Sequence, residues 1–385
     1  MVSDPRIAMV AGEASGDLLA GLMLDGLQQK WPALQALGIG GPQMQRRGFQ
    51  CLWPSDKLAV HGYSMEVLRR LRELLSIRKT LRNQLLEDKP AVFIGVDAPD
   101  FNLGLEADLR AAGVKTVHFV CPSIWAWRAN RVEKIRRSAD HVLCIFPFEP
   151  ELLARHGIAA TYVGHPLASV IPRVPDRSAA RQQLGLSDRD EVLAILPGSR
   201  SAEIQYIAPP FFKAAALIHQ ARPATKLIVP AVPSLKARIE EQVLAAGLQG
   251  VVQVVHGQSH AVLAACDTTL IASGTATLEA ALFKRPMVIA YHMHPLSWWL
   301  MRRKQLQPWV GLPNILCGEF VVPELIQDAA TPEALCAATL QWLLAREDAP
   351  EKIRALEQRF DVLHESLQRD TSQLAADAIE KVIAS

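Results

Sequence analysis

The sequence predicts an α/β protein with two Rossmann-like domains that face each other across a cleft. Its 385 residues exceed the length of one typical domain. In both halves of the chain, short apolar runs alternate with longer helical patterns, as they do in βαβ units. A proline-dotted stretch at residues 165–178 separates the halves and is typical of a linker.

The first half contains apolar runs that are typical of buried parallel strands. They are residues 6–12, 91–97, 115–121, 141–146 and 160–164. Amphipathic segments such as residues 18–30 and 103–112 lie between them and are predicted to be helices.

The same alternation restarts in the second half of the chain. Its predicted strands are residues 191–200, 225–231, 250–257, 268–273 and 286–291, and its predicted helices lie near 202–221, 233–246 and 275–284. From about residue 332 the pattern is purely helical. Ligands are expected at the carboxyl ends of the strands in such a pair of domains.

Composition limits the classes of function. Lysine plus arginine outnumber aspartate plus glutamate by only 41 to 39, which excludes a globally basic nucleic-acid binder. The six cysteines lack C-x-x-C spacing and predict reduced thiols, not a disulfide framework or a zinc site. The residues after Met1 do not fit the pattern of a signal peptide, so none is expected. No apolar stretch reaches the ~18 residues that a spanning helix needs. Strict G-x-G-x-x-G and Walker motifs are missing, so dehydrogenases and P-loop enzymes are not favoured.

Asp97 and Asp100 follow a predicted strand in the stretch GVDAPDFN, residues 95–102. A turn of this kind aims polar side chains into the mouth of the cleft, so either carboxylate is a candidate general base. The alternative is that Asp100 caps a helix that begins near Phe101. A general base and a helix cap can lie at the same strand end and be different residues.

Ser199 and Arg200 follow another predicted strand in the stretch LPGSR, residues 196–200. The Arg200 guanidinium is suited to pair bidentately with a diphosphate and to stabilise charge on a leaving group. A surface arginine paired with Glu203 is the alternative, ranked lower because the motif interrupts an otherwise apolar strand end.

The stretch SGTATLE, residues 273–279, ends a strand and begins a helix. Ser273, Gly274 and Thr275 form a small turn that suits a phosphate at a helix N-terminus. Glu279, about one turn into the helix, is a candidate for accepting both hydroxyls of a ribose. A plain capping motif is the alternative, because Ser and Thr are ordinary N-caps and Glu is an ordinary first-turn residue.

Two segments combine apolar and basic side chains, as anionic membrane interfaces require. The first, residues 65–85, has leucines at helical spacing among arginines; its alternative is a helix packed on its own domain. The second, residues 297–304, contains the candidate contacts Trp298, Trp299, Leu300, Met301, Arg302 and Arg303. Two adjacent tryptophans cannot both face one core from a regular helix, which favours surface contact.

Taken in order, the motifs of the chain resemble those of the lipid-A-disaccharide synthase family. They are AGEASGD (11–17), GIGGPQM (38–44), GVDAPDFN (95–102), PSIWAWR (122–128), VGHPL (163–167), LPGSR..EI (196–204), SGTATLEAAL (273–282) with PMVIAY (286–291), and GLPNIL (311–316) with VPELIQ (322–327). The resemblance runs nearly end to end and is specific; only the C-terminal part of the chain lacks such a motif.

The resemblance implies a GT-B glycosyltransferase, with two facing Rossmann-like domains and a C-terminal helix that crosses back to the first domain. The first domain is expected at residues 1–165, joined by the helix at about 355–385, and the UDP-sugar-binding domain at 166–354. The implied reaction joins UDP-2,3-diacylglucosamine to the 6-hydroxyl of 2,3-diacylglucosamine 1-phosphate through a β-1,6 linkage, with inversion and without a metal or cofactor. Both substrates are acylated, which implies a cytoplasmic protein peripherally associated with the cytoplasmic face of the inner membrane.

The resemblance also assigns roles to residues. Asp100 is the first choice for the base, and Asp97 is the alternative base or the residue that orients it. Arg200 and the amides of Ser273 to Ala276 are expected to bind the diphosphate. Glu279 is expected to bind the ribose. Asn314 is expected either to contact the donor or to order the adjacent loop. The turn containing Gly12, Ser15 and Gly16 is expected to meet donor phosphate or acceptor.

Two other functions fit the same architecture. A UDP-sugar epimerase or hydrolase would need no lipid-facing surface, so the two apolar and basic segments argue against it. A nucleotide-sugar sensor or membrane-recruited binding module would not need Asp97 or Asp100.

Overall fold

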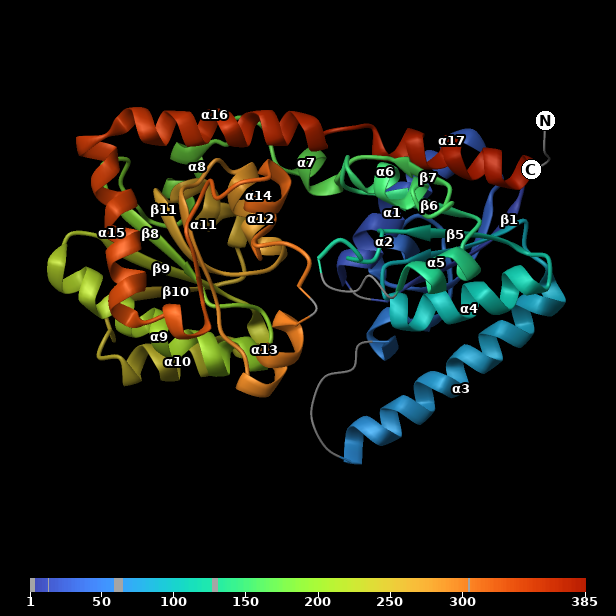
Figure 1. Ribbon diagram of the computed structural model, residues 1–385, viewed down its shortest axis with the longest axis horizontal. Coiled ribbons are helices and arrows are strands. Elements are labelled where there is room, and N and C mark those ends of the chain that lie inside the picture. Colours follow the sequence, from blue (N-terminus) through green and yellow to red (C-terminus); the bar gives the residue numbers. More distant parts are fainter. Residues whose placement is uncertain (1–3, 13, 59–64, 127–130, 304) are drawn as a thin grey trace. The chain divides into compact units, whose positions relative to one another are not determined.

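The computed structural model describes residues 4–12, 14–58, 65–126, 131–303 and 305–385 (Figure 1). The chain divides into two compact units. Unit 1 comprises Met1–Ser169 and Ser366–Ser385, and unit 2 comprises Val170–Glu365. The sequence predicted that the first domain ends after residue 165 and that the chain returns to it at about residue 355. In the structure the chain returns to unit 1 at Ser366, later than expected.

Within the described residues of unit 1, a parallel sheet has the strand order β3-β2-β1-β4-β5-β6-β7. The strands are β1 (Arg6–Ala11), β2 (Gln35–Gly40), β3 (Gln50–Pro54), β4 (Val92–Val96), β5 (Lys115–Phe119), β6 (His141–Cys144) and β7 (Ala160–Tyr162). The predicted parallel strands are confirmed. The sequence missed β2, which contains glycines that weaken a strand pattern, and the edge strand β3.

Helices cover both faces of this sheet. They are α1 (Ala14–Lys30), α2 (Pro42–Gln45), α3 (Met65–Asp88), α4 (Pro99–Ala111), α5 (Val132–Ser138), α6 (Glu149–Ala154), α7 (Pro166–Val170) and α17 (Thr371–Ala384). The C-terminal helix α17 packs against α1, where a Cβ on Gly26 would lie 2.2 Å from the carbonyl oxygen of Ser372. Only glycine permits so close an approach of the two backbones.

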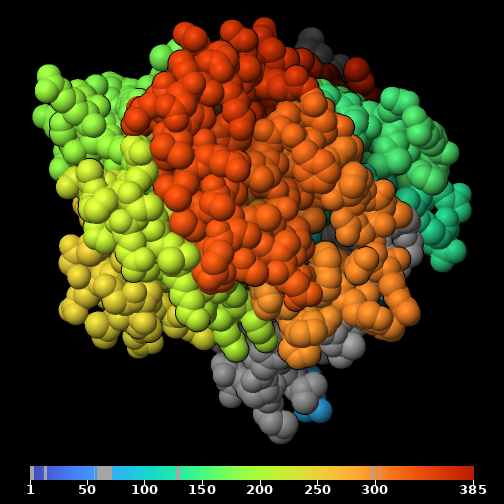
Figure 2. Space-filling view, turned by 60° about the vertical axis from the view of Figure 1, so that its left-hand side comes forward, coloured from blue at the N-terminus to red at the C-terminus, as the bar shows by residue number. Residues whose placement is uncertain are grey.

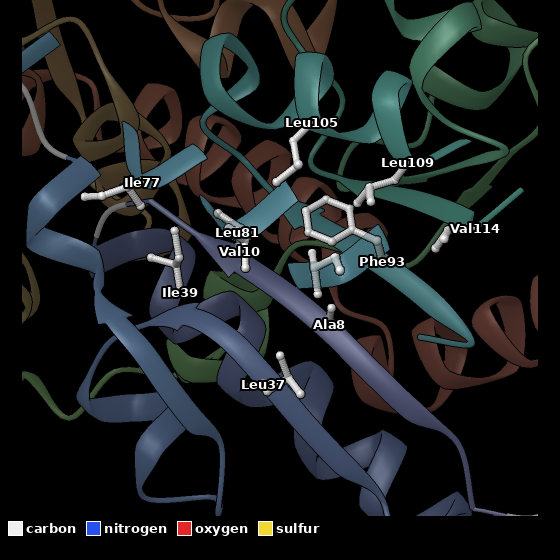
Figure 3. Close-up of a cluster of buried hydrophobic side chains, with 11 residues drawn as sticks. Ala8, Val10, Leu37, Ile39, Ile77, Leu81, Phe93, Leu105, Leu109 and Val114 are labelled. Atoms are coloured by element: carbon white, nitrogen blue, oxygen red, sulfur yellow. The ribbon is translucent and has the colours of Figure 1, made fainter. Parts of the chain in front are cut away.

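The core on the α3 and α4 side of the sheet comes from alternate strand positions, as the period of two in a strand requires (Figure 3). Ile77, Leu81 and Leu85 of α3 pack into this core at helical spacing. The alternative of a helix packed on its own domain is therefore confirmed for the carboxyl half of α3. Leu75 is 55% exposed, and the side chains of residues 65–71 lie outside the described part, so membrane contact there stays a prediction.

Within the described residues of unit 2, a second parallel sheet has the order β10-β9-β8-β11-β12-β13. Its strands are β8 (Val192–Leu196), β9 (Lys226–Ala231), β10 (Val252–His256), β11 (Thr268–Ala272), β12 (Met287–Tyr291) and β13 (Glu324–Ile326). Its helices are α8 (Arg177–Gln183), α9 (Ser201–Ala221), α10 (Lys236–Ala245), α11 (Ser259–Ala265), α12 (Thr275–Leu282), α13 (Pro295–Arg302), α14 (Leu312–Cys317), α15 (Pro332–Asp348) and α16 (Pro350–Leu367). The sequence missed β13, a short edge strand. The predicted linker at residues 165–178 contains α7 and the start of α8.

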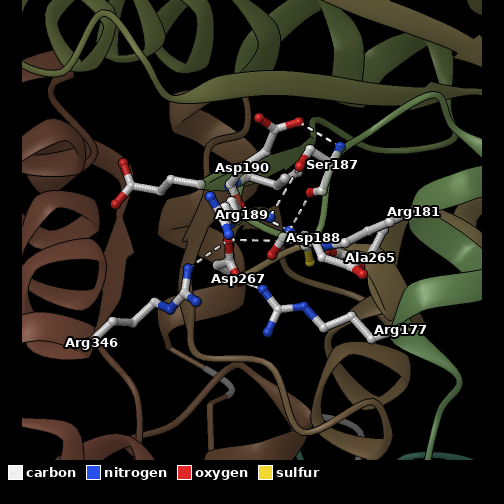
Figure 4. Close-up of polar contacts among 12 residues, drawn as sticks. Arg177, Arg181, Ser187, Asp188, Arg189, Asp190, Ala265, Asp267 and Arg346 are labelled. Carbon is white, nitrogen blue, oxygen red and sulfur yellow. Dashed lines mark hydrogen bonds and ion pairs between the residues drawn. The ribbon is translucent and has the colours of Figure 1, made fainter.

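Asp267 fixes the amino end of β11 (Figure 4). Its buried carboxylate accepts a hydrogen bond from the Val192 amide at 2.8 Å. It also forms ion pairs with Arg346, whose Nη1 lies 2.6 Å from Oδ2, and with Arg177 and Arg181. A buried carboxylate is stable only when it is paired in this way. The cluster holds the amino end of β11 against β8. The carboxyl ends of these two strands carry candidate site motifs.

Candidate functional site

In each sheet, two neighbouring strands mark the point where the strand order reverses: β1 and β4 in unit 1, and β8 and β11 in unit 2. The candidate turns GEASGD, GVDAPD, LPGSR and SGTATLE directly follow these strands. Open α/β sheets bind ligands outside the carboxyl ends of the strands at this point. The prediction that the candidate residues lie at strand ends is therefore confirmed, and each unit has one such edge.

The turn after β4 has an unusual backbone. Asp97 and Ala98 adopt φ angles of 52° and 42°, in the left-handed region that side-chain-bearing residues rarely occupy. Helix α4 then begins at Pro99, with Ala98 and not Asp100 at its N-cap, so the capping alternative for Asp100 is wrong. The Asp100 side chain is 80% exposed, and its Oδ1 lies 2.5 Å from Nη2 of Arg131. Asp100 is therefore an accessible carboxylate beside a guanidinium.

The turn after β1 packs against the Asp97 turn. A Cβ added to Gly12 would lie 2.7 Å from the Cβ of Ala98, so glycine is needed for this contact. Gly16 is buried, whereas Ser15 is exposed.

Asp17, at the end of the GEASGD motif, has a role that the sequence did not reveal. Its carboxylate accepts hydrogen bonds from the amides of Gly41, Gln43 and Met44 at 2.9, 2.8 and 3.1 Å. Asp17 thereby holds the GIGGPQM loop beside the carboxyl end of β1. These bonds cap the N-terminus of α2, whose own N-cap residue Gly41 has no side chain to do so.

The turn after β8 is organised by Glu203. Its Oε2 accepts hydrogen bonds from the amides of Ser199 and Arg200 at 2.8 and 3.1 Å, which caps the N-terminus of α9. A Cβ on Gly198 would lie 2.4 Å from that oxygen. The Arg200 side chain is 67% exposed, and its Nη1 lies 3.5 Å from Oε1 of Glu203. The lower-ranked alternative, an exposed arginine beside Glu203, is thus the observed arrangement, and it leaves most of the guanidinium accessible.

The turn after β11 lacks such a cap. Gly274 is the N-cap residue of α12, and no side chain of a described residue caps this helix. The Ser273 hydroxyl donates instead to the carbonyl of Val310 at 3.2 Å, so the plain capping alternative is wrong. The prediction that the Ser273 amide binds phosphate is wrong, because this amide donates to the Ala290 carbonyl at 2.9 Å. The amides of Thr275 and Ala276 at the start of α12 belong to the groups that have no acceptor within the helix. They form the anion-binding end of a helix dipole.

Glu279 is the fifth residue of α12 and thus lies in its second turn, one turn later than the first-turn position considered above. Its Oε2 lies 3.5 Å from Nε2 of His260, at the start of α11. The sequence missed His260, although GQSH follows the carboxyl end of β10 as the other motifs follow their strands. Among the described residues, no cluster of three or more His, Cys, Asp or Glu side chains could hold a metal ion.

Asn314 is buried and its amide group is fully used within its own loop. Its Nδ2 donates to the Val322 carbonyl at 2.9 Å and to Oε1 of Glu324 at 2.8 Å, and its Oδ1 accepts from the amides of Val321 and Val322. These contacts support the ordering of the loop and not direct donor contact. Glu324 also accepts from the amides of Val310 and Gly311 at 2.8 and 2.9 Å, while burial raises the pKa of its carboxyl.

Trp125, from the PSIWAWR motif, packs edge-to-face on Phe146 and Phe148. Its Nε1 donates to Oε1 of the buried Glu149 at 3.0 Å. Burial raises the pKa of Glu149 to about 7, against the opposing hydrogen bonds from the Phe146 amide and Trp125. The other motif residues Trp127 and Arg128 lie outside the described residues.

The predicted membrane segment forms α13 and lies at the surface of unit 2, within the orange region of Figure 2. Trp299 is 48% exposed, and the guanidinium carbon of Arg303 lies 3.7 Å from its ring centre. Arg302 is exposed, whereas Trp298 and Met301 are half-buried. The side chain of Leu300 lies outside the described part. No helix among the described residues is long and apolar enough to cross a membrane.

Solved structures share this architecture across the chain. A UDP-GlcNAc 2-epimerase from Neisseria meningitidis bound to UDP-GlcNAc aligns with a TM-score of 0.63 at 11% identity, covering 98% of this chain and 99% of that chain. The glycotransferase of kitacinnamycin aligns with a TM-score of 0.56 at 17% identity, covering 98% of this chain and 99% of that chain. The two switch-point sheets thus define the GT-B class of two-domain α/β proteins, which includes UDP-sugar glycosyltransferases and epimerases.

Sequence similarity is more specific than fold. The family model for lipid-A-disaccharide synthetase matches residues 7–379. Lipid-A-disaccharide synthase from Verminephrobacter eiseniae is 73% identical over 98% of this chain and 97% of that protein, and the protein of the same name from Albidiferax ferrireducens is 68% identical over 98% and 97%. The chain belongs to the lipid-A-disaccharide synthase family and is a UDP-sugar glycosyltransferase of lipid A biosynthesis. This finding separates it from the epimerase and sensor alternatives.

Proposed function

We propose that the protein transfers 2,3-diacylglucosamine from UDP to the 6-hydroxyl of 2,3-diacylglucosamine 1-phosphate. The base takes the proton of the acceptor hydroxyl, whose oxygen forms the new bond to the anomeric carbon. The bond from that carbon to the diphosphate breaks, and UDP leaves. The products are a β-1,6 tetraacyl disaccharide 1-phosphate and UDP, with inversion at the anomeric carbon.

The uncapped N-terminus of α12, followed by Glu279, is the single observation that carries this proposal. The amides of Thr275 and Ala276 are suited to bind the diphosphate, and Glu279 to accept the ribose hydroxyls. The exposed guanidinium of Arg200 is suited to neutralise charge that grows on the leaving UDP. These groups supply the charge stabilisation without a metal ion, so we expect activity to persist in EDTA.

Asp100 is our first choice for the base because its carboxylate is exposed at the end of β4. Asp97 is the alternative, or it orients Asp100. An inverting displacement needs the base on the face of the sugar opposite the leaving UDP, so we assign the base to unit 1 and UDP binding to unit 2.

The lipid substrates suggest a membrane partner. Exposed Trp299, stacked with Arg303, combines an aromatic ring with positive charge, which favours an anionic lipid surface. We propose that α13 contacts the cytoplasmic face of the inner membrane and that the protein associates with it peripherally.

UDP release by the purified protein with UDP-2,3-diacylglucosamine, measured with and without 2,3-diacylglucosamine 1-phosphate, tests the proposal. Acceptor-dependent release, with a disaccharide product by mass analysis, is the expected result. Release that does not depend on the acceptor indicates a hydrolase. UDP binding without turnover on either substrate indicates a sensor, and either outcome overturns the proposal.

A further inference from the structure

Beneath the Asp97 turn lies a cluster of buried polar side chains that the proposed reaction does not use. Asn102, Glu106 and His118 are each 0% exposed. Nδ1 of His118, on β5, lies 2.7 Å from Oε1 of Glu106, on α4. Burying such groups costs free energy, and one polar atom of each has no hydrogen-bond partner among the described residues. Replacing buried polar groups by well-packed apolar side chains is often neutral or stabilising, so stability alone does not account for this cluster.

Asn102 connects the ends of two strands. Its Nδ2 donates to the carbonyl of Asp97 at 2.8 Å and also lies 3.3 Å from the carbonyl oxygen of Val10 and 3.4 Å from that of Val96. Val10 belongs to β1 and Val96 ends β4, the strands at which the strand order reverses. One side-chain amide therefore ties together the two strand ends that carry the candidate site of unit 1.

Gly95 makes room for this cluster. A Cβ on Gly95 would lie 2.1 Å from Oε1 of Glu106 and 2.8 Å from the Cβ of Asn102. Gly95 is also the register partner of His118 in the sheet. The contacts are thus continuous from β5, through α4, to the turn after β4.

The turn itself needs support. Asp97 and Ala98 both lie in the left-handed region, which residues with a Cβ occupy only when the surrounding structure holds them there. The amide of Asp97 donates to the carbonyl of Phe119 at 2.8 Å, and the carbonyl of Asp97 accepts from Asn102. The backbone amide and the backbone carbonyl of Asp97 are therefore both held by groups in the interior of unit 1.

We propose that Asn102, supported by Glu106 and His118, is a positioning residue that fixes the Asp97–Ala98 turn and thereby orients the carboxylates of Asp97 and Asp100. This inference rests on the proposed function, and it holds for either carboxylate as the base, since both depend on the same turn. Burial raises the pKa of Glu106 and His118 opposes this effect, so a neutral glutamine is the conservative replacement at position 106.

Asn102→Leu in the full chain is the first test, because leucine has a similar volume and no donor. A misdirected base lowers kcat by a factor on the order of 10², while the donor KM and the UDP Kd stay within about threefold of wild type. Ser138→Ala is the matched control, because it removes a buried hydrogen bond of 2.5 Å from α5 to the Leu103 carbonyl of α4. We expect Ser138→Ala to lower the unfolding temperature and to keep the wild-type kcat. Equal losses of kcat in the two variants, or a wild-type kcat in Asn102→Leu, would overturn the inference.

A second pair of variants decides the question if Asn102→Leu does not fold. Glu106→Gln retains a hydrogen bond to His118, whereas Glu106→Leu removes it. We expect Glu106→Gln to keep most of the wild-type kcat and Glu106→Leu to lose about tenfold. Equal kcat values for the two variants contradict the proposal. A wild-type protein without acceptor-dependent UDP release defeats the proposed function, whereas an active wild type with a fully active Asn102→Leu defeats only this inference.

Discussion

Nε2 of His260 lies 3.5 Å from Oε2 of Glu279, so the start of α11 contacts the second turn of α12. The two residues are 19 positions apart in sequence and belong to different helices. Their contact places a basic ring beside the carboxylate that we assign to the ribose. We therefore include His260 in the donor site that we propose, although no motif identified it.

Glu279→Ala is expected to weaken UDP binding by about tenfold or more, because a hydrogen bond to a charged group contributes about 1.5–3 kcal/mol. His260→Ala is expected to have a smaller effect in the same direction, since the imidazole acts through Glu279. Isothermal titration with UDP measures both. Glu240→Ala on α10, an exposed carboxylate paired with Lys236, is the control and should leave the UDP Kd unchanged. An unchanged Kd in Glu279→Ala would refute the ribose contact.

Asp100→Asn is expected to lower kcat by a factor on the order of 10² with an unchanged UDP Kd, because loss of a general base affects the transition state. Asp108→Asn, on the same helix and paired with Arg82, serves as the control and should remain active. Steady-state kinetics with both lipid substrates measures the effect. Retained activity in Asp100→Asn would move the role of the base to Asp97.

Glu324→Gln is expected to loosen the loop that begins at Val310. A glutamine can accept through only one of its two terminal atoms, so one of the donors that now share the carboxylate is left unpaired. The loss should be about 1–3 kcal/mol of unfolding free energy, with a raised donor KM because Ser273 contacts the same loop. Glu319→Gln, at an exposed position of that region, is the control. A wild-type donor KM in Glu324→Gln would separate the loop from donor binding.

Glu149 should make stability depend on pH. Burial raises its pKa to about 7 from an ordinary value of 4.5, so between these values the folded state binds a proton that the unfolded state releases. The folded protein therefore loses stability as the pH rises through this window, by on the order of 3 kcal/mol in total. Glu149→Gln should flatten the dependence measured by chemical denaturation from pH 4 to pH 8, whereas the exposed Glu151→Gln should not. Parallel curves for wild type and Glu149→Gln would contradict the assignment.

Replacing Trp298 and Trp299 by serine is expected to reduce binding to anionic liposomes without unfolding the protein, because aromatic side chains anchor a surface at the lipid headgroups. Pelleting with vesicles measures binding, and circular dichroism measures folding. Leu244→Ser combined with Val362→Ser is the control, since both side chains are exposed apolar residues of other helices of unit 2. Full pelleting of the tryptophan variant would refute the assignment of α13 to the interface.

The predicted strands at both switch points were confirmed because they are buried on both faces and therefore form continuous apolar runs. The sequence missed three strands. Strand β2 contains glycines, and β3 and β13 lie at sheet edges, where the pattern of apolar residues is weaker. The candidate motifs were found for a related reason. Small and polar residues directly after an apolar run are visible in the chain without knowledge of its neighbours.

The sequence by itself determined the α/β class, the two halves and the strand ends that carry the site, because periodicity and turn composition are local properties of the chain. Only the tertiary structure decided what each polar group contacts. Glu203 caps α9, Asn314 orders its loop, and Asp17 holds a loop that begins more than twenty positions away. These contacts depend on packing between distant segments, and a hydrogen bond of about 3 Å is decided by the positions of both partners. Residue identity supplies only the donor or the acceptor.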